Sequence, residues 1–185
     1  YSDEGWYLGE HGWYDKRWMY EESLVMPLVI RWPGVVEPGS INDDIVSNLD
    51  FAETFLDIAG AGIPREMQGR SFLPILKGRT PADWRKTFYY HYYEFPGAHS
   101  VARHYGVTDG HYKLINFYEN KDWEMFDLTA DPNELQSIYG RKEYVGIQSR
   151  LEKELVRLRQ YYKVPNKDPD STRPKPRPKR INKKK

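Results

Sequence analysis

The sequence predicts an α/β fold that ends in a small antiparallel sheet closed by a helix, and three patterns support this. An apolar, β-branched run over 25–32 ends at Pro33-Gly34, as a buried strand often does. Short stretches rich in aromatic and β-branched residues fill 87–128, which is typical of antiparallel strands. Residues 144–162 repeat apolar side chains at helical spacing.

The first half of the chain is expected to contain loops, one strand and one clear helix. Residues 1–24 are rich in glycine and aromatic residues without a sustained period, which indicates a loop with a short helical turn. Asp50 and Glu53 have the spacing of a capping box, and Gly60 can end the helix that they begin. The apolar face of this helix is predicted to consist of Phe51, Phe55, Leu56 and Ile58. A further helical turn is expected over 71–76.

The second half is expected to form three or four antiparallel strands packed by one helix. The candidate strands are 87–95, 101–107, 111–118 and 123–128. Asp109-Gly110 predicts a tight turn between the second and the third. The helix over 144–162 is expected to cover the sheet with its apolar face, formed by Leu151, Leu155, Leu158 and Tyr162.

The chain is expected to have three parts: 1–85, the strand-rich 86–162 with its closing helix, and 163–185, which charge and composition set apart. The last part holds ten Lys or Arg against two Asp, so the rest of the chain carries a net charge of −7. Because Pro interrupts this basic tail repeatedly, we expect it to be extended and disordered. It could contact polyanions by charge or serve only as a solubilising end. It lacks the interleaved aromatic residues that would indicate specific nucleic-acid binding.

Several classes of site are excluded by composition. The chain has no Cys, so it contains no disulfide, no thiolate metal ligand and no cysteine nucleophile. No apolar run is long enough to span a membrane, and no signal peptide is visible. The sequence starts at Tyr1, directly in a glycine-rich stretch, which predicts a fragment or a processed chain.

The opening stretch combines residues that could handle an anionic ester. Asp3 and Glu4 are adjacent carboxylates before Gly5, and both could reach one hard cation such as Ca²⁺ or Mg²⁺. An exposed acidic turn would have the same sequence. His11 lies between glycines, as a catalytic or an ordinary loop histidine could. Lys16 lies among aromatic residues, and an ammonium near a metal would neutralise charge on an oxyester.

Taken together, these motifs resemble the type I, formylglycine-dependent sulfatase family of the alkaline phosphatase superfamily. The resemblance extends over about residues 1–162. Its first block comprises Ser2–Gly5, Leu8–Gly12, Trp13–Arg17, Tyr20–Ser23 and Pro27–Gly34. Later matches are Ser47–Asp50, Gly69–Leu73, Phe126–Leu128 and Asp131–Glu134.

The resemblance implies roles for three residues of the opening stretch. Asp3 corresponds to the metal-binding Asp of the family, and Glu4 occupies the place of a second donor that is usually Asn, His or Gln. Glu is a departure, because its charge could tighten the cation and repel sulfate. Lys16 corresponds to the lysine that contacts the sulfate group. Ca²⁺ is the expected cation, with Mg²⁺ as an alternative, and residues 1–85 are expected to end an alkaline-phosphatase-like α/β domain.

The nucleophile that the resemblance implies is absent from the chain. In the family a Cys or Ser within a C/S-x-P/A-S-R-like motif becomes formylglycine, whose hydrate attacks sulfur while the cation and the lysine offset charge. This chain lacks the motif, the early Asp pair and the upstream His and Lys. We therefore expect it to be inactive alone and to need an upstream sulfatase portion as its partner. The resemblance also implies a periplasmic or secreted location, where sulfated polysaccharides occur.

A second candidate surface lies in the aromatic-rich stretch 88–118, which contains four of the five His. His99, Arg103 and His104 could hydrogen-bond sugar hydroxyls or an anionic group. Equally, these side chains could alternate between core and solvent in a sheet. No His pair has i, i+4 spacing, which argues against zinc. The stretch is similar to bacterial sulfatases acting on 6-O-sulfated N-acetylglucosamine and related glycosaminoglycan sugars.

The expected function is sulfate-ester hydrolysis on sulfated glycans. A phosphodiester or phosphonate hydrolase of the same superfamily would use the same Asp3 position, because the tetrahedral anions are similar. A non-catalytic fragment that binds anionic polymers through the tail is the third possibility.

Overall fold

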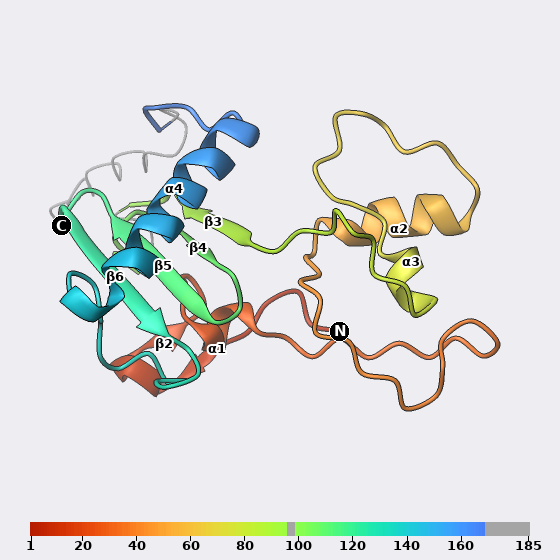
Figure 1. The fold of residues 1–185 in the computed structure, drawn as a ribbon, viewed down its shortest axis with the longest axis horizontal. Helices are drawn as coiled ribbons and strands as arrows, with labels where there is room; N and C mark the ends of the chain where they lie inside the picture. Colours follow the sequence, from red (N-terminus) through yellow and green to blue (C-terminus); the bar gives the residue numbers. More distant parts are fainter. Residues whose placement is uncertain (96–98, 169–185) are drawn as a thin grey trace, which may run out of the picture.

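The fold, taken from a computed structural model, is described for residues 1–95 and 99–168. Figure 1 shows the sheet β3–β6 with helix α4 across it in one part, and helices α2 and α3 with long loops in the other. The elements in chain order are β1 (Tyr7–Leu8), η1 (Glu10–Gly12), β2 (Tyr14–Asp15), α1 (Glu21–Leu24), α2 (Asp50–Ile58), α3 (Leu73–Leu76), β3 (Phe88–Tyr92), β4 (His104–Thr108), β5 (Tyr112–Phe117), β6 (Asp122–Asp127), η2 (Lys142–Tyr144) and α4 (Val145–Tyr161).

The predicted antiparallel sheet is present and has four strands. Its strands are antiparallel in the sequence β3-β4-β5-β6, and Val107, Leu114 and Met125 face one another across three of them. The predicted turn joins β4 to β5, with Gly110 at a φ of 83°. The Asp109 carboxylate accepts the backbone N–H groups of the two residues after Gly110. Local turn chemistry therefore fixes this hairpin.

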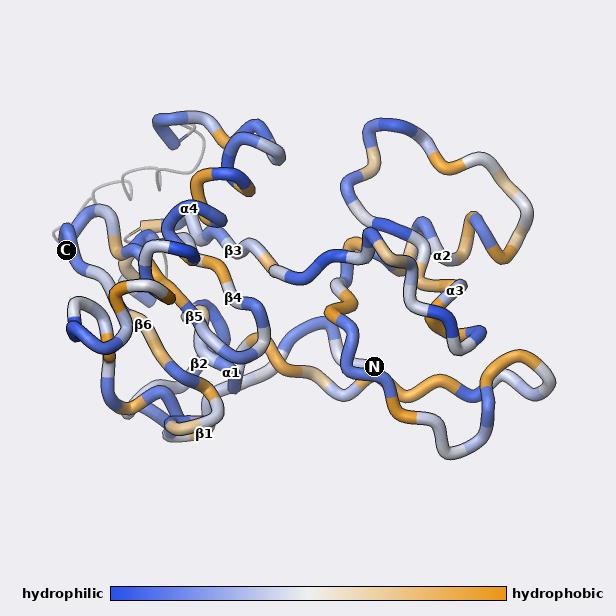
Figure 2. The backbone as a smooth tube through the Cα atoms, in the orientation of Figure 1, coloured by the Kyte–Doolittle hydropathy of each residue, from blue (hydrophilic) through white to orange (hydrophobic). Residues whose placement is uncertain are grey.

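Helix α4 covers one face of the sheet, as predicted. Its buried residues Leu151, Leu155 and Leu158 pack on Val107, Leu114 and Met125. Hydrophobic and hydrophilic colours alternate along α4 in Figure 2, in agreement with a helix that has one buried face.

The opening stretch covers the other face of the same sheet. Tyr7, Met19 and Tyr20 are buried there against β5 and β6 residues Ile115, Phe117 and Phe126. Contact is close at Gly106 of β4, where an added Cβ would lie 2.5 Å from Met19 Sδ. The opening stretch therefore packs with 86–162, although the sequence pattern had placed it with the rest of 1–85.

Helix α2 has the predicted position but not the predicted faces. Its carboxylate at Asp50 accepts the N–H groups of Ser47 (2.7 Å) and Arg70 (2.8 Å), and no side chain caps the helix. The capping-box prediction is thus wrong. The apolar-face prediction is confirmed only for Phe51, which packs on the buried Phe72, because Phe55 is 65% exposed and Ile58 is also exposed. The buried side chains of α2 are Asp50, Glu53 and Thr54.

The predicted strand over 25–32 does not form. The segment has no strand hydrogen bonding in the described structure, and Val25 and Val29 are exposed. An apolar run favours a strand only when another strand can pair with it, and no described segment pairs with this one.

The described chain after α4 continues to Asp168 and remains in contact with the sheet. The Tyr118 hydroxyl donates to the Asp168 carboxylate at 2.7 Å. The basic tail is predicted from residue 163, and most of it, 169–185, lies outside the described residues. No helix in the described ranges is both long and apolar enough to cross a membrane.

Candidate functional site

Asp3, Glu4 and Lys16 line one cleft of about 400 Å³. The cleft lies between the opening stretch, the segment just before α2 and the sheet. Its other described lining residues include Glu21, Ser23, Ser47, Asn48, Phe88, Tyr90 and Thr108. The structure thus brings together the three residues that the sequence motif singled out.

The acidic end of the cleft is fixed by main-chain contacts. Gly5 N–H donates to the Ser23 carbonyl at 2.9 Å. A Cβ on Gly5 would lie 1.9 Å from the carbonyl oxygen of Glu22, so no larger residue fits here without displacement. The Asn48 side-chain amide donates to the Asp3 carbonyl at 2.5 Å. These contacts hold the backbone that carries both carboxylates.

Lys16 is held at the same place from the other side. Its carbonyl accepts the Ser23 hydroxyl at 2.6 Å, and its ammonium lies 5.1 Å from the centre of the Trp6 ring. The ammonium forms an ion pair with the Glu4 carboxylate. Glu4 and Lys16 were predicted to bind a cation and an anion separately, but here they neutralise each other, so either ligand would have to compete with this pair.

The chemistry of the acidic end suits a hard divalent cation only in part. Asp3 is exposed, and with Glu4 it offers two carboxylates. Ca²⁺ takes six to eight oxygen ligands, so two side chains cannot complete a site. No cluster of three or more His, Cys, Asp or Glu suited to a metal occurs within 1–95 and 99–168. These residues therefore fit as a partial ligand set that other groups would have to complete.

His11 is packed away from the cleft. Its ring stacks on Tyr20 with centroids 4.4 Å apart, and its Nε2 lies 3.4 Å from the Glu22 carboxylate. It is not among the residues that line the cleft. The flanking residues Gly9 and Gly12 have φ values of 135° and 74°, which glycine adopts without steric cost, so the chain can turn sharply here.

The second candidate surface separates into one exposed and two buried residues. His99 is exposed. Arg103 is buried, and its guanidinium lies 3.1 Å from the Glu119 carboxylate and 3.5 Å from that of Asp168. His104 is fully buried and stacks on Trp18. None of the three lines the cleft.

Burial also decides the charge state of His104. Burial lowers the pKa of its imidazole to about 4, although a hydrogen bond with the Ala102 carbonyl opposes this shift. The ring is therefore neutral near pH 7. In this position His104 is a core residue and presents no polar atom to a ligand.

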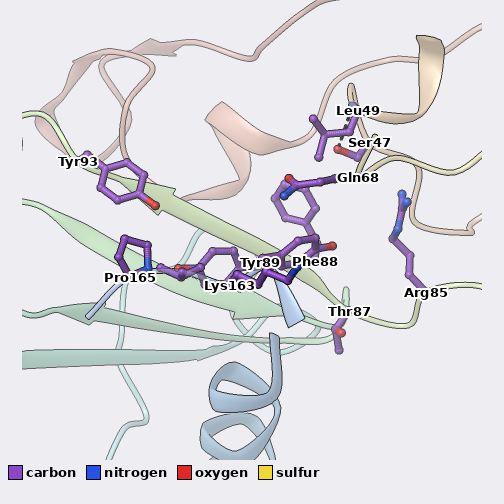
Figure 3. A pocket seen from close by; sticks show the side chains of 12 residues that line it. Ser47, Leu49, Gln68, Arg85, Thr87, Phe88, Tyr89, Tyr93, Lys163 and Pro165 are labelled. Carbon is purple, nitrogen blue, oxygen red and sulfur yellow. Dashed lines mark hydrogen bonds between the residues drawn. The ribbon is translucent and has the colours of Figure 1, made fainter. Parts of the chain in front are cut away.

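A second hollow of about 240 Å³ lies beside β3 (Figure 3). Figure 3 shows Tyr93 and Gln68 on opposite sides of it. Its described lining contains two cations, Arg85 and Lys163, and no carboxylate. Arg85 is already ion-paired with the buried Asp50. A hollow without carboxylates lacks the ligands that a hard cation needs, so the cleft at Asp3 remains the candidate site.

Sequence reasoning missed Asn48 and Tyr90 as residues of the cleft. Asn48 stands in the motif Ser47–Asp50, which had been matched to the family without a role. Tyr90 lies on β3, and its hydroxyl donates to the Arg17 carbonyl at 3.0 Å. Only the alternation of side chains along β3 could have indicated which tyrosine faces the opening stretch.

Comparison with known proteins gives consistent matches. The family model described as "N-sulphoglucosamine sulphohydrolase, C-terminal" matches residues 9–161. An N-acetylglucosamine-6-O-sulfatase of Bacteroides thetaiotaomicron is 52% identical over 172 residues, 91% of this chain and 30% of that protein. An N-acetylglucosamine-6-sulfatase of Capra hircus is 42% identical over 86 residues, 45% of this chain and 15% of that protein.

Among solved structures, a protein in complex with its substrate D-glucosamine-2-N,6-O-disulfate matches with a TM-score of 0.84 and 51% identity. The match covers 88% of this chain and 33% of that one. A phosphonate monoester hydrolase from Silicibacter pomeroyi matches at 24% identity and a TM-score of 0.72, with 82% and 32% covered, which shows a shared fold alone. The chain spans about a third of the length of the relatives that it matches over most of its own length.

Proposed function

This chain belongs to the N-sulphoglucosamine sulphohydrolase C-terminal family, within the sulfatases, and we propose that it forms part of a sulfatase acting on 6-O-sulfated N-acetylglucosamine or a related glycosaminoglycan sugar. The observation that carries this proposal is the shared cleft of Asp3, Glu4 and Lys16. Relatives named for N-acetylglucosamine-6-sulfatase activity support the substrate class.

In the proposed reaction, this chain orients a sulfate group and balances its charge. The Lys16 ammonium can donate a hydrogen bond to a sulfate oxygen when its ion pair with the Glu4 carboxylate is broken. Asp3 and Glu4 would contribute oxygen ligands to a cation, with Ca²⁺ as the proposed ion and Mg²⁺ as the alternative. When bound, such a cation supplies positive charge next to the sulfate oxygens. The formylglycine nucleophile has to come from an upstream portion of the protein, so we propose that this chain alone is inactive.

Exposed apolar residues support the proposal of an upstream partner portion. Val25, Val29, Phe55 and Ile58 are all exposed, although residues of these types are usually buried. Figure 2 shows hydrophobic stretches in the loops around α2 and α3. An upstream sulfatase portion packed on these residues would bury them, and a paired strand there would give 25–32 the partner that it lacks. We also propose a periplasmic or secreted location, and this proposal rests on the family resemblance.

The proposal is tested with a full-length protein that contains this chain. Sulfate release from 6-O-sulfated N-acetylglucosamine is compared with hydrolysis of an aryl phosphonate monoester. We expect a kcat/KM at least tenfold higher for the sulfate ester. No sulfate release, or a preference for the phosphonate, would show that the proposed function is wrong and would favour the phosphonate hydrolase alternative.

The role of the acidic end is tested by Asp3→Asn in the same protein. Loss of a carboxylate ligand should raise the Ca²⁺ concentration that gives half-maximal sulfate release by tenfold or more. Asp122→Asn is the matched control, because Asp122 is an exposed carboxylate on β6. An unchanged Ca²⁺ requirement in Asp3→Asn would contradict the ligand role.

A further inference from the structure

A lysine and two glutamates form a buried cluster beneath the candidate site. Lys113 on β5 is 0% exposed, and its ammonium lies 2.7 Å from the Glu21 carboxylate and 2.8 Å from the Glu134 carboxylate. Glu134, in the loop after β6, is 3% exposed. An ammonium without access to water is very costly unless carboxylates surround it, so these three groups depend on one another.

Glu134 also binds the backbone of α1 directly. One of its carboxylate oxygens accepts the Glu21 N–H at 2.7 Å, while the other faces Lys113. Its own φ is 50°, a conformation that non-glycine residues adopt only when surrounding contacts enforce it. Burial raises the pKa of Glu134 to about 7, and the attraction of Lys113 opposes that rise. The Glu134 carboxylate therefore makes two contacts, one with the backbone at the start of α1 and one with Lys113 on β5.

Helix α1 in turn holds both ends of the candidate site. Ser23 on α1 donates its hydroxyl to the Lys16 carbonyl at 2.6 Å. The Ser23 carbonyl accepts the Gly5 N–H at 2.9 Å, directly after Glu4. A continuous set of contacts thus runs from Lys113 and Glu134, through α1, to the backbone of the acidic end and of the lysine.

We propose that Lys113 and Glu134 are positioning residues for this site: they anchor α1 to the sheet, and α1 sets the separation of the Asp3-Glu4 pair from Lys16. The expected effect on catalysis rests on the proposed function. The anchoring of α1 to the sheet does not depend on that function. Neither side chain lines the cleft, so neither would touch the sulfate ester.

The test uses Lys113→Met and Glu134→Gln in the full-length protein. Glu134→Gln keeps the shape of the side chain and removes its charge, and Met replaces the lysine stem without its ammonium. We expect kcat for 6-O-sulfated N-acetylglucosamine to fall at least fivefold in Glu134→Gln and at least tenfold in Lys113→Met. The double variant should be no worse than Lys113→Met, because the two residues act as a unit. Arg150→Met, which removes an exposed ion pair with Asp109, is the matched control and should leave kcat unchanged.

A second measurement separates positioning from general stability and does not depend on activity. Amide hydrogen exchange should become at least tenfold faster over residues 3–24 in Glu134→Gln and stay within twofold over α4. Rates within twofold of the parent over 3–24, or equal acceleration over α4, would overturn the proposal, as would a Glu134→Gln protein that does not fold. If the parent protein releases no sulfate, the proposed function fails, while the exchange pattern still decides the anchoring.

Discussion

The four-stranded sheet and the region of α2 differ in how fully their apolar side chains are covered. The sheet has α4 on one face and the opening stretch on the other, and its central residues Leu114 and Ile115 are fully buried. Helix α2 buries Asp50, Glu53 and Thr54 while leaving Phe55 exposed. Hydrophobic packing on both faces therefore stabilises the sheet, whereas the α2 region combines a small apolar core of Phe72, Ile75 and Trp84 with buried polar contacts.

The largest effect is expected from Asp50→Ala, because this residue organises the α2 region. Its fully buried carboxylate pairs with Arg85 and binds two backbone N–H groups. Removing one partner of a buried ion pair costs about 3–5 kcal/mol. Urea unfolding of the full-length protein measures this change. A loss below about 1 kcal/mol would mean that packing, not this polar cluster, holds α2.

Leu155→Ala should be the next most damaging change and acts on the sheet. Leu155 is 2% exposed and packs between α4 and the strands. Truncation of a buried leucine costs about 2–5 kcal/mol. The comparison to make is with Leu135→Ala, since Leu135 is 68% exposed and should change stability by less than about 0.5 kcal/mol. Equal effects would deny that α4 and the sheet form a core.

Acid should weaken the sheet through His104. Its pKa is lowered from 6.5 to about 4 by burial, so the folded protein binds the proton more weakly than the unfolded protein does. Stability that is present above pH 6.5 is then lost as the pH falls towards 4. His104→Phe should reduce this loss by about 3 kcal/mol in thermal or urea unfolding across that range. A pH dependence that is the same in the parent and in His104→Phe would contradict this assignment.

The smallest effect is expected from Phe55→Ser in the 185-residue chain. Phe55 is 65% exposed, so its loss should cost less than about 0.5 kcal/mol. In a full-length protein the same change should cost more, because the proposed upstream portion would cover this side chain. If Phe55→Ser lowers the free energy of unfolding by the same small amount in both proteins, the upstream portion does not cover Phe55. The proposed difference in how the sheet and the α2 region are covered would then be wrong.

The sequence predicted the parts of the fold that depend on local patterns. The aromatic and β-branched composition of 87–128, the turn at Asp109-Gly110 and the leucine spacing of α4 are all local signals, and the structure agrees with them. The run over 25–32 failed as a strand because a residue pattern does not specify a pairing partner. The burial of Phe55 was predicted wrongly for a related reason, since periodicity marks an apolar face but not what covers it.

The sequence predicted which residues form the site but not which of them form ion pairs with one another. The opening motif identified Asp3, Glu4 and Lys16, which do line one cleft. Their spacing could not indicate that Glu4 and Lys16 pair with each other. The sequence also could not reveal the role of Lys113. A lysine in a strand usually faces solvent, but Lys113 on β5 is fully buried against two carboxylates. The Lys113 cluster joins residues far apart in the chain, and the Glu4–Lys16 pair depends on how the opening stretch folds back on itself.

Lys16 is the residue of this cleft that we propose contacts the sulfate ester. The direct test of this contact is the kcat of Lys16→Met for 6-O-sulfated N-acetylglucosamine in the full-length protein, with the exposed Lys153→Met on α4 as control. Loss of a group that stabilises developing charge should lower kcat by about 100-fold or more, while the control keeps the parent rate. A Lys16→Met enzyme that turns over within twofold of the parent would contradict the account.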